Sequence, residues 1–419
     1  MEPNALDDDD VVITGRGIVS PLGNTLDDAL VGLRQGRCAI GFDPEFAERG
    51  FRSQVSGRIT GLDPAAYFTP EQQLSMSKAA LYSSAATMQA VRESGLTPDD
   101  CAREMTGVVL GSGIAGLGTS YRNYDTLRAS GSPRRVGGHG VDTTMASTCA
   151  ANAAVLLRTR GVGEALSSAC ATGVQCIGYA YRLIRHGYQD TVVAGAADED
   201  GWETAYSFDA MRALCADSND RPERASRPLD ATRSGFVASG GSGVVVLERY
   251  ARARARGARP LARVAGYWSS SDGSGDMMAP SADGQVRVVA GALRSGNLTT
   301  SSIDYVNLHG TSTKIGDVVE MTALASVLGE HDYLVSSSKS QIGHALGAAG
   351  AIELVLALLM LQHGFVGGSL NVERLDPALE RYRRWIAFEP TPRRLRRIMS
   401  NSFGFGSTNA SIILDRVES

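Results

Sequence analysis

The chain has 419 residues, of which 43% are hydrophobic and 21% charged, and its formal net charge is −4. This length predicts two or three domains or two fused halves, with enough apolar residues for a large core. The slightly acidic balance does not favour nucleic acid or an anionic membrane as a partner, and it leaves a carrier protein or a small substrate open. Six scattered cysteines without a CxxC pair indicate reduced thiols in the cytoplasm and argue against a zinc or other metal site.

The N-terminal segment 1–10, MEPNALDDDD, lacks the basic and apolar blocks of a signal peptide. We expect this acidic segment to be disordered and the ordered chain to begin at Val11. The longest apolar stretch, from Ala345 to Leu361, is interrupted by Glu353 and is too short to span a membrane. It therefore predicts a buried helix, and no membrane association is expected.

A faint internal repeat accounts for the length of the chain without a linker. Two strand-like segments and then a helix-like segment occur twice in the same order. The first series is 11–17, 107–113 and 170–187, and the second is 263–271, 305–313 and 344–364. Both helix-like segments begin with a reactive residue, continue with small residues and end in His-Gly. The pattern predicts an α/β fold with two pseudo-equivalent halves, 11–255 and 256–419, whose central buried helices meet at their N-termini.

Cys170 lies where a strand-like segment gives way to the first of these helices. Backbone N–H groups and the positive end of a helix dipole lower the pKa of a thiol, which suits a nucleophile. A lone cysteine in a large chain is more often a small buried hydrophobe, and we assign that structural role to Cys149, Cys176 and Cys215.

Two of the six histidines, His309 and His344, stand at predicted element ends beside glycines. An imidazole in such a place can reach into a cavity, whereas a single histidine elsewhere is more often a structural residue. If the two central helices share a centre, both histidines come from the second half to meet Cys170. The other four histidines have no comparable setting.

Ordered motifs along nearly the whole chain resemble the elongation-type β-ketoacyl-acyl-carrier-protein synthases. The motifs are VVITGRGIVSPLGN, SSACATG, SFDAMRAL, SRPLDATRSGFV, HGTSTKIGD, KSQIGHALGAAG and MSNSFGFGSTNA. The resemblance implies the thiolase fold, in which two duplicated halves form an αβαβα layered sandwich. It also implies no cofactor, because the substrates arrive on the phosphopantetheine arm of an acyl carrier protein.

Carried over residue by residue, the resemblance implies that Cys170 receives the acyl group and that His309 and His344 assist decarboxylation of a malonyl unit. It implies that Lys339 and Glu353 support His344, although an incidental loop lysine is the alternative. The remaining roles concern the acyl carbonyl, the gate, the pantetheine arm and the carrier. The backbone N–H groups of Cys170 and Phe403 are implied to stabilise the acyl carbonyl, and Ile114 and Phe403 to form the gate. Thr311 and Thr313 are implied to hydrogen-bond the pantetheine arm, and Arg134 and Arg135 to bind the carrier.

Three segments of the chain depart from the pattern of the family. Gly240 stands where many relatives carry Glu, and Ser407 replaces a glycine of the gating loop. If position 407 needs a positive φ, its serine strains that loop. Glu71 and Leu74 lie where fatty-acid relatives present basic residues to an acidic carrier. These residues favour a dedicated carrier in a specialised type II polyketide pathway over fatty acid synthesis.

Several related activities fit the sequence less well. A degradative thiolase needs a second catalytic cysteine near the C-terminus, and no cysteine follows Cys215. Initiation synthases use Cys, His and Asn as their three catalytic residues, whereas His344 occupies the third of these positions here. The main alternative is a chain-length factor, the non-catalytic partner in a ketosynthase heterodimer, but such subunits normally lack the thiol of Cys170. A carrier-binding scaffold, and either a homodimer or a heterodimer, remain open.

Overall fold

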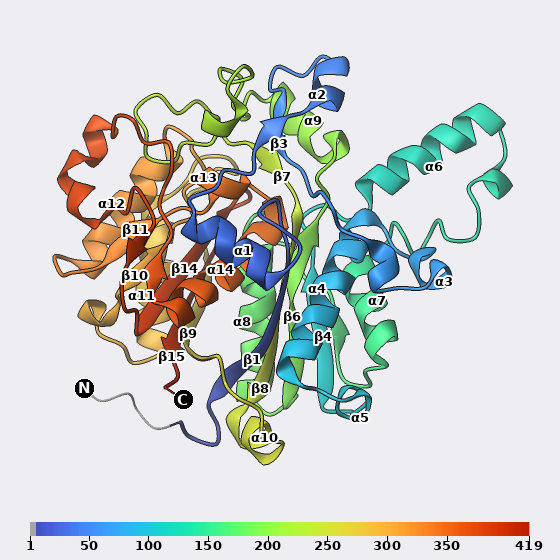
Figure 1. Cartoon of the computed structure of the whole chain (residues 1–419), viewed down its shortest axis with the longest axis horizontal. Helices are drawn as coiled ribbons and strands as arrows, with labels where there is room; N and C mark the ends of the chain where they lie inside the picture. Colours follow the sequence, from blue (N-terminus) through green and yellow to red (C-terminus); the bar gives the residue numbers. More distant parts are fainter. Residues whose placement is uncertain (1–5, 419) are drawn as a thin grey trace.

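A ten-stranded mixed sheet runs through the protein, whose residues 6–418 are described by a computed structural model (Figure 1). Its strands are β1 (Val11–Val19), β4 (Thr106–Gly111), β5 (Gly163–Glu164), β6 (Thr191–Asp198), β8 (Gly241–Arg249), β9 (Ala262–Ser271), β10 (Tyr305–Asn307), β11 (Leu334–Ser336), β14 (Arg397–Gly404) and β15 (Thr408–Arg416). They lie side by side in the order β11-β10-β14-β15-β9-β1-β8-β6-β4-β5.

The sheet consists of two halves with the same topology. In the N-terminal half, β8 pairs antiparallel with both β1 and β6, and β4 pairs parallel with both β6 and β5. In the C-terminal half, β15 pairs antiparallel with β9 and β14, and β10 pairs parallel with β14 and β11. The halves join where Val12 and Ile13 of β1 meet Arg263 and Ala262 of β9. This repeat confirms the prediction of two pseudo-duplicated halves.

Helices complete five layers around the two halves of the sheet. The central helices, α8 (Thr172–Arg185) and α14 (Ala349–His363), each pack on strands from both halves. The outer faces carry α4 (Lys78–Ser94) and α7 (Thr148–Leu157) on one side and α11 (Ala282–Ser295) and α12 (Gly316–Leu328) on the other. Separate apolar clusters fill the middle layer and the two outer interfaces. The arrangement confirms the predicted αβαβα sandwich.

Small residues allow the central helices to touch at their N-terminal ends. A Cβ atom on Gly173 would lie 2.5 Å from the backbone nitrogen of Ala351, so the two backbones are in contact at this point. Helix α14 is buried from Ala349 to Leu361, because both sheet halves enclose it. Helix α8 differs from the predicted buried helix at its C-terminal end, since residues such as Arg185 reach solvent. The close crossing holds the segments before both helices near one point.

The remaining elements surround this sandwich. The α-helices are α1 (Leu26–Arg34), α2 (Pro44–Glu48), α3 (Pro70–Gln73), α5 (Pro98–Cys101), α6 (Leu117–Ser130), α9 (Trp202–Ala210), α10 (Tyr250–Ala255) and α13 (Lys339–Ile342). The short strands are β2 (Gly41–Phe42), β3 (Val55–Gly57), β7 (Ala238–Ser239), β12 (Phe365–Val366) and β13 (Thr391–Pro392). The 3-10 helices are η1 (Pro64–Ala66), η2 (Pro133–Arg135), η3 (Pro222–Arg224), η4 (Thr300–Ser302), η5 (Leu346–Ala348) and η6 (Pro377–Trp385).

The acidic N-terminal segment is ordered over the part that the structure describes. Asp7 and Asp10 close a turn, and Asp8 and Asp9 form ion pairs with Arg254 and Arg249 next to or within α10. The expectation of disorder over 1–10 is therefore wrong for residues 6–10, because nearby arginines neutralise this run of carboxylates. Residues 1–5, which belong to the same prediction, lie outside the described residues.

One helical stretch, Leu346–His363, is long and apolar enough to cross a membrane, but 89% of it is buried inside the protein. It comprises η5 and α14, the centre of the sandwich. The expectation that the apolar stretch after Ala345 forms a buried helix is confirmed.

Candidate active site

Cys170 lies in a tight turn directly before α8. The preceding residue, Ala169, has φ +48°, a left-handed conformation that is uncommon for a residue with a Cβ atom. The hydroxyl of Thr172 holds this turn, since it accepts from the backbone N–H of Ser168 at 2.8 Å and donates to the carbonyl of Ala169 at 2.7 Å. Cys170 is 8% exposed, so its sulfur lies at the bottom of a cavity rather than in the packed core alone.

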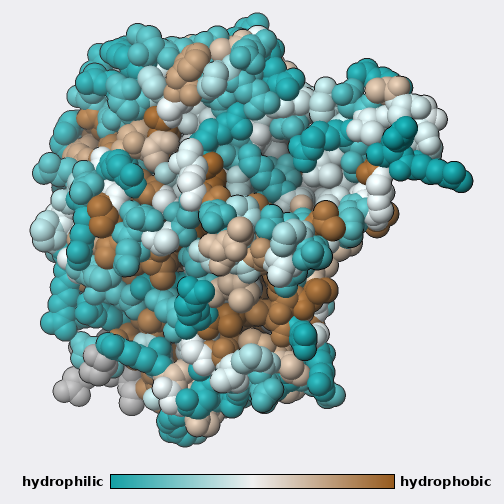
Figure 2. All heavy atoms as spheres, turned by 45° about the vertical axis from the view of Figure 1, so that its right-hand side comes forward, coloured by the Kyte–Doolittle hydropathy of each residue, from teal (hydrophilic) through white to brown (hydrophobic). Residues whose placement is uncertain are grey.

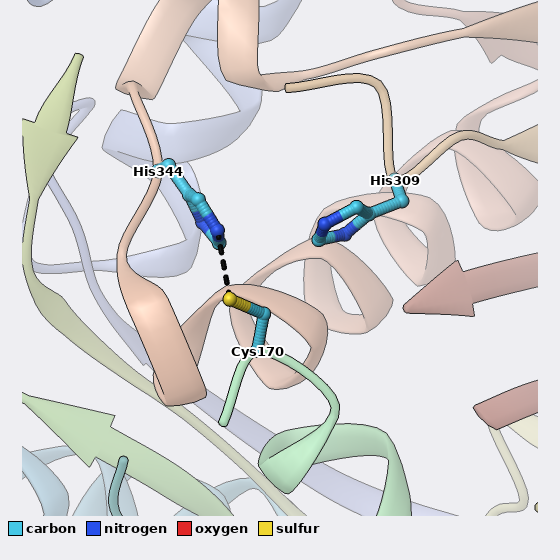
Figure 3. A group of neighbouring side chains, drawn as sticks. All are labelled: Cys170, His309 and His344. Atoms are coloured by element: carbon cyan, nitrogen blue, oxygen red, sulfur yellow. Dashed lines mark hydrogen bonds between the residues drawn. The ribbon is translucent and has the colours of Figure 1, made fainter. Parts of the chain in front are cut away.

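Cys170, His309 and His344 meet in this cavity, as Figure 3 shows. The Nε2 atom of His344 lies 3.1 Å from the sulfur of Cys170, and the rings of His344 and His309 are 5.4 Å apart between centroids. One ligand-type atom from each residue lies within 4.8 Å of the other two. His309 follows β10 and His344 precedes η5, so both histidines come from the C-terminal half. The predicted convergence of the three side chains is confirmed.

The electrostatics of the trio differ from the sequence-based expectation. Burial raises the pKa of the Cys170 thiol to about 12, and this effect exceeds the lowering by Lys339 and by the backbone N–H groups of Phe405 and Cys170. The predicted fall in the pKa of Cys170 is therefore wrong, because desolvation of the thiolate outweighs the donors at the start of α8. Burial and then the charge of Lys339 hold the pKa of both His309 and His344 well below the usual range. At neutral pH the thiol S–H thus donates to a neutral His344.

Lys339 and Glu353 form a buried ion pair beside the histidines. Their side chains are 1% and 0% exposed, and the ammonium of Lys339 donates to a carboxylate oxygen of Glu353. Burial raises the pKa of Glu353, while Lys339 opposes this shift. Lys339 lies on α13, just before His344, and its positive charge opposes a divalent cation at the trio, although the three side chains have the spacing of a metal site. The expected absence of a metal stays a prediction.

Glu320, on α12, holds the backbone on which His309 stands. Its carboxylate accepts from the backbone N–H groups of His309 and Gly310, both at 2.8 Å. Burial raises the pKa of Glu320 to about 8. No motif or spacing in the sequence pointed to this residue, because only the return of α12 toward the end of β10 brings its carboxylate to the backbone of His309.

The loop after Gly310 forms one side of the cavity and carries both threonines. The hydroxyls of Thr311 and Thr313 lie 3.1 Å apart, and both residues line the cavity. Arg233 holds this loop from the N-terminal half: its guanidinium donates to the carbonyl of Thr313 at 2.8 Å and of Lys314 at 2.6 Å. Arg233 is fully buried and pairs with Asp317 at 3.2 Å. The sequence analysis did not select Arg233, although it lies in one of the quoted motifs.

The backbone donor assigned to Phe403 belongs to a different residue. Phe403 pairs with Asn409 in the β14–β15 ladder, and its ring packs against His309 with centroids 5.9 Å apart. The backbone N–H that acts on the sulfur of Cys170 is that of Phe405. The prediction was therefore displaced by two residues, because the chain turns toward Cys170 only where β14 ends.

The two expected gating positions also differ in their surroundings. Phe403 lines the cavity, whereas Ile114 lies outside its lining and packs against the apolar cluster that contains Leu346. Ser407 has φ +64°, so the condition for strain in this loop is met. Its hydroxyl donates to the carbonyl of Asp276 at 3.2 Å, which ties the loop to the facing segment. A gating role for Ile114 or for the Phe403–Phe405 loop stays a prediction.

The cavity has a volume of about 520 Å³ and reaches the surface beside Met277, Met278 and Lys314. Arg134 and Arg135 lie elsewhere, on η2 at the end of an arm that includes α6 and stands away from the main body (Figure 1). Both arginines are exposed and so remain available to a partner.

A cysteine at the start of one central helix, facing two histidines from the second sheet half, is the arrangement of a thiolase-fold acyltransferase. Sequence comparison identifies the family within that class. A model of the "Beta-ketoacyl synthase, N-terminal domain" matches residues 8–253, and one of the "Beta-ketoacyl synthase, C-terminal domain" matches residues 261–373. The chain belongs to the β-ketoacyl synthase family.

Known relatives resemble the chain over nearly its whole length. It is 43% identical to 3-oxoacyl-[acyl-carrier-protein] synthase 1 of Haemophilus influenzae, over 97% of this chain and 98% of that protein. A β-ketoacyl synthase from Burkholderia phymatum has the same fold, with a TM-score of 0.91, 34% identity, and coverage of 98% and 100% of the two chains. The AntDE ketosynthase, solved with the type II PKS acyl-carrier protein AntF, has a TM-score of 0.88, 26% identity, and coverage of 98% and 99%.

Proposed function

We propose that the protein is a β-ketoacyl-acyl-carrier-protein synthase, which joins an acyl group held on Cys170 to a malonyl unit with loss of carbon dioxide. The contact of 3.1 Å between the sulfur of Cys170 and Nε2 of His344, with His309 in the same cavity, carries this proposal. The similarity to 3-oxoacyl-[acyl-carrier-protein] synthases supports it.

In the first step, the sulfur of Cys170 attacks the carbonyl of an acyl thioester while its proton passes to Nε2 of His344. A new C–S bond forms to Cys170, the C–S bond to the pantetheine arm breaks, and the departing thiolate takes the proton back from His344. Because the pKa of the thiol is raised, a base in direct contact is needed at neutral pH. The neutral imidazole of His344 suits that role.

In the second step, the bond between the malonyl carbon and its carboxylate breaks and leaves an enolate. That carbon attacks the acyl carbonyl, the C–S bond to Cys170 breaks, and the thiolate recovers a proton from solvent. Once acylated, Cys170 has no S–H, so Nε2 of His344 can carry a hydrogen and donate it to the enolate oxygen together with His309. In the proposal, the backbone N–H groups of Phe405 and Cys170, which lower the pKa of the thiol, stabilise the charge on the acyl carbonyl.

Three groups position this machinery in the proposal. Lys339, held by Glu353, adds to the effect of burial in lowering the pKa of His344 and His309, and Glu320 fixes the backbone of His309. Thr311 and Thr313 hydrogen-bond the pantetheine arm as it descends the cavity. The substrates themselves supply all the reacting groups, so no cofactor is needed.

We propose an acyl carrier protein and a second ketosynthase-type chain as partners. Arg134 and Arg135 on the exposed arm suit an acidic carrier. The strand β5 ends the sheet, and Figure 2 shows an apolar area below the arm, near α7, where Val155 is 77% exposed. A face of this kind favours a homodimer or a ketosynthase heterodimer.

The identity to 3-oxoacyl-[acyl-carrier-protein] synthases favours the fatty-acid reaction, and the six free cysteines suit the cytoplasm. A specialised polyketide role remains a second candidate, because exposed Glu71 and Leu74 offer an acidic carrier no positive charge at α3. A chain-length factor is disfavoured, since Cys170 and its histidine partner are both present.

The direct test incubates the protein with acyl-carrier protein and malonyl-carrier protein and measures the carrier products by intact mass. A β-ketoacyl carrier two carbons longer than the acyl donor is expected, and Cys170→Ala should abolish it. Covalent modification of Cys170 by cerulenin gives an independent readout. If the wild-type protein neither elongates nor takes up an acyl group with fatty-acid or polyketide carriers, the proposal is wrong.

A further inference from the structure

Gln285 is a buried polar residue in the cavity wall that the reaction described above does not use. It lies in the first turn of α11, is 2% exposed and lines the cavity that contains Cys170. Its Oε1 atom is buried without a hydrogen-bond partner among the described residues. An unsatisfied buried amide is costly unless something that binds in the cavity completes its hydrogen bonds.

Gln285 belongs to a polar wall of the cavity. Asp272 and Asn409, which also line it, are joined by a hydrogen bond of 2.7 Å from Asn409 Nδ2 to Asp272 Oδ1. The first turn of α11 packs closely against this pair, since a Cβ atom on Gly284 would lie 2.0 Å from Oδ1 of Asp272. Asn409 pairs with Phe403 in the sheet, and the ring of Phe403 packs on His309. The polar wall is therefore on the His309 side.

The other side of the cavity is apolar. Phe208, Phe236 and Leu346 line it and pack together in one cluster, and the ring of Phe236 lies 5.2 Å from that of His344. These apolar side chains suit an alkyl chain attached to Cys170. On the polar side, the segment before α11 leads back to Met277 and Met278. These two residues are 72% and 54% exposed at the surface end of the cavity. A substrate arm that enters beside Met277 and Met278 passes along the polar wall on its way to Cys170.

We infer that the side-chain amide of Gln285 hydrogen-bonds an amide of the pantetheine arm, in the same cavity as Thr311 and Thr313. A carboxamide offers both a donor and an acceptor, which matches the N–H and C=O of an amide in the arm. The inference rests on the proposed function and makes Gln285 a specificity-determining residue, which selects the thioester carrier rather than the acyl chain.

The test measures transfer of one saturated acyl group to Cys170 by intact mass, from a pantetheine thioester and from an amide-free butanethiol thioester. Gln285→Met keeps the volume of the side chain and removes its hydrogen bonds. We expect the variant to raise KM for the pantetheine thioester about three- to tenfold with little change in kcat, and to leave the butanethiol reaction unchanged. Gln285→Leu repeats the test should the methionine variant fold poorly.

Gln189→Met is the matched control, because Gln189 is also a buried glutamine with an unpartnered Oε1 but lies outside the cavity lining. It should leave both reactions at the wild-type rate. An equal loss with both thioesters would overturn the inference in favour of a structural role. The test is repeated with a β-oxo acyl group, and a loss that appears only there would also overturn the inference, because Gln285 would then contact the acyl chain. If wild-type Cys170 takes up no acyl group, the proposed function fails together with the inference.

Discussion

Removal of the buried ammonium of Lys339 should destabilise the protein in a pH-dependent way. Lys339→Met keeps much of the side-chain volume but leaves the carboxylate of Glu353 without its partner, in a site where both side chains are essentially inaccessible to solvent. Breaking one side of a buried pair costs about 3–5 kcal/mol. For a chain of 419 residues this corresponds to a fall in Tm of roughly 3–6 °C.

The pH dependence follows from Glu353. Its pKa is raised in the folded protein by burial, and the loss of Lys339 removes a group that opposes this shift. A carboxyl whose pKa is higher in the folded than in the unfolded state contributes stability below its unfolded pKa of 4.5, and that contribution is lost as pH rises through the folded value. The deficit of Lys339→Met should therefore grow as pH rises from 5 to 9.

The assay is thermal and urea denaturation of wild type and Lys339→Met across that pH range. The double variant Lys339→Met/Glu353→Gln serves as the control, because it removes the charge that titrates and should have a nearly constant difference from wild type. A Tm for Lys339→Met equal to wild type at pH 8, or a deficit that grows as pH falls, would refute the assignment of a buried charged pair. Decarboxylation of malonyl thioester by Lys339→Met should also be slower, since the nearby histidines keep the effect of burial on their pKa but lose the additional lowering by the charge of Lys339.

Three further results follow from the site. Because burial raises the pKa of Cys170 to about 12, its alkylation by iodoacetamide should accelerate about tenfold per pH unit between pH 7 and 9, and a plateau near neutrality would contradict this. His344→Ala should abolish decarboxylation of malonyl thioester and slow acyl transfer to Cys170 by roughly 10²-fold or more; wild-type rates of either step would remove His344 from that step. Gly240→Ala should lower stability by roughly 1–3 kcal/mol in urea titrations, since its Cβ atom would lie 2.6 Å from the backbone nitrogen of Asp200, and an unchanged midpoint would show that the backbone yields.

The clash at Gly240 also explains one departure of the sequence from its family. The backbone of residues 198–200 occupies the space that a side chain at position 240 would need. A glutamate at position 240 therefore requires a different course of this neighbouring segment. At Ser407, in contrast, the left-handed φ persists with a serine, and a hydrogen bond to Asp276 partly offsets its cost.

The resemblance identified the residues of the reacting trio, and the repeated order of strands and helices predicted that Cys170 and His344 would meet. Both predictions depend on features that are local in sequence: a reactive residue at an element end, small residues after it, and an apolar helix. The donor near Cys170 could not be located in this way. The backbone direction at Phe403 and Phe405 depends on where β14 leaves its ladder with β15, and that point is set by pairing with a distant strand.

The sequence by itself determined the two-fold repeat, the buried central helices and the identity of Cys170, His309 and His344. Only the tertiary structure decided the protonation of these groups and the residues that hold them. Desolvation depends on everything packed around a side chain, so it reversed the pKa expected for Cys170 from the start of α8 alone. Glu320, Arg233 and Gln285 lie at the site because segments far apart in the chain pack around one cavity. The spacing of residues along the sequence does not predict that packing.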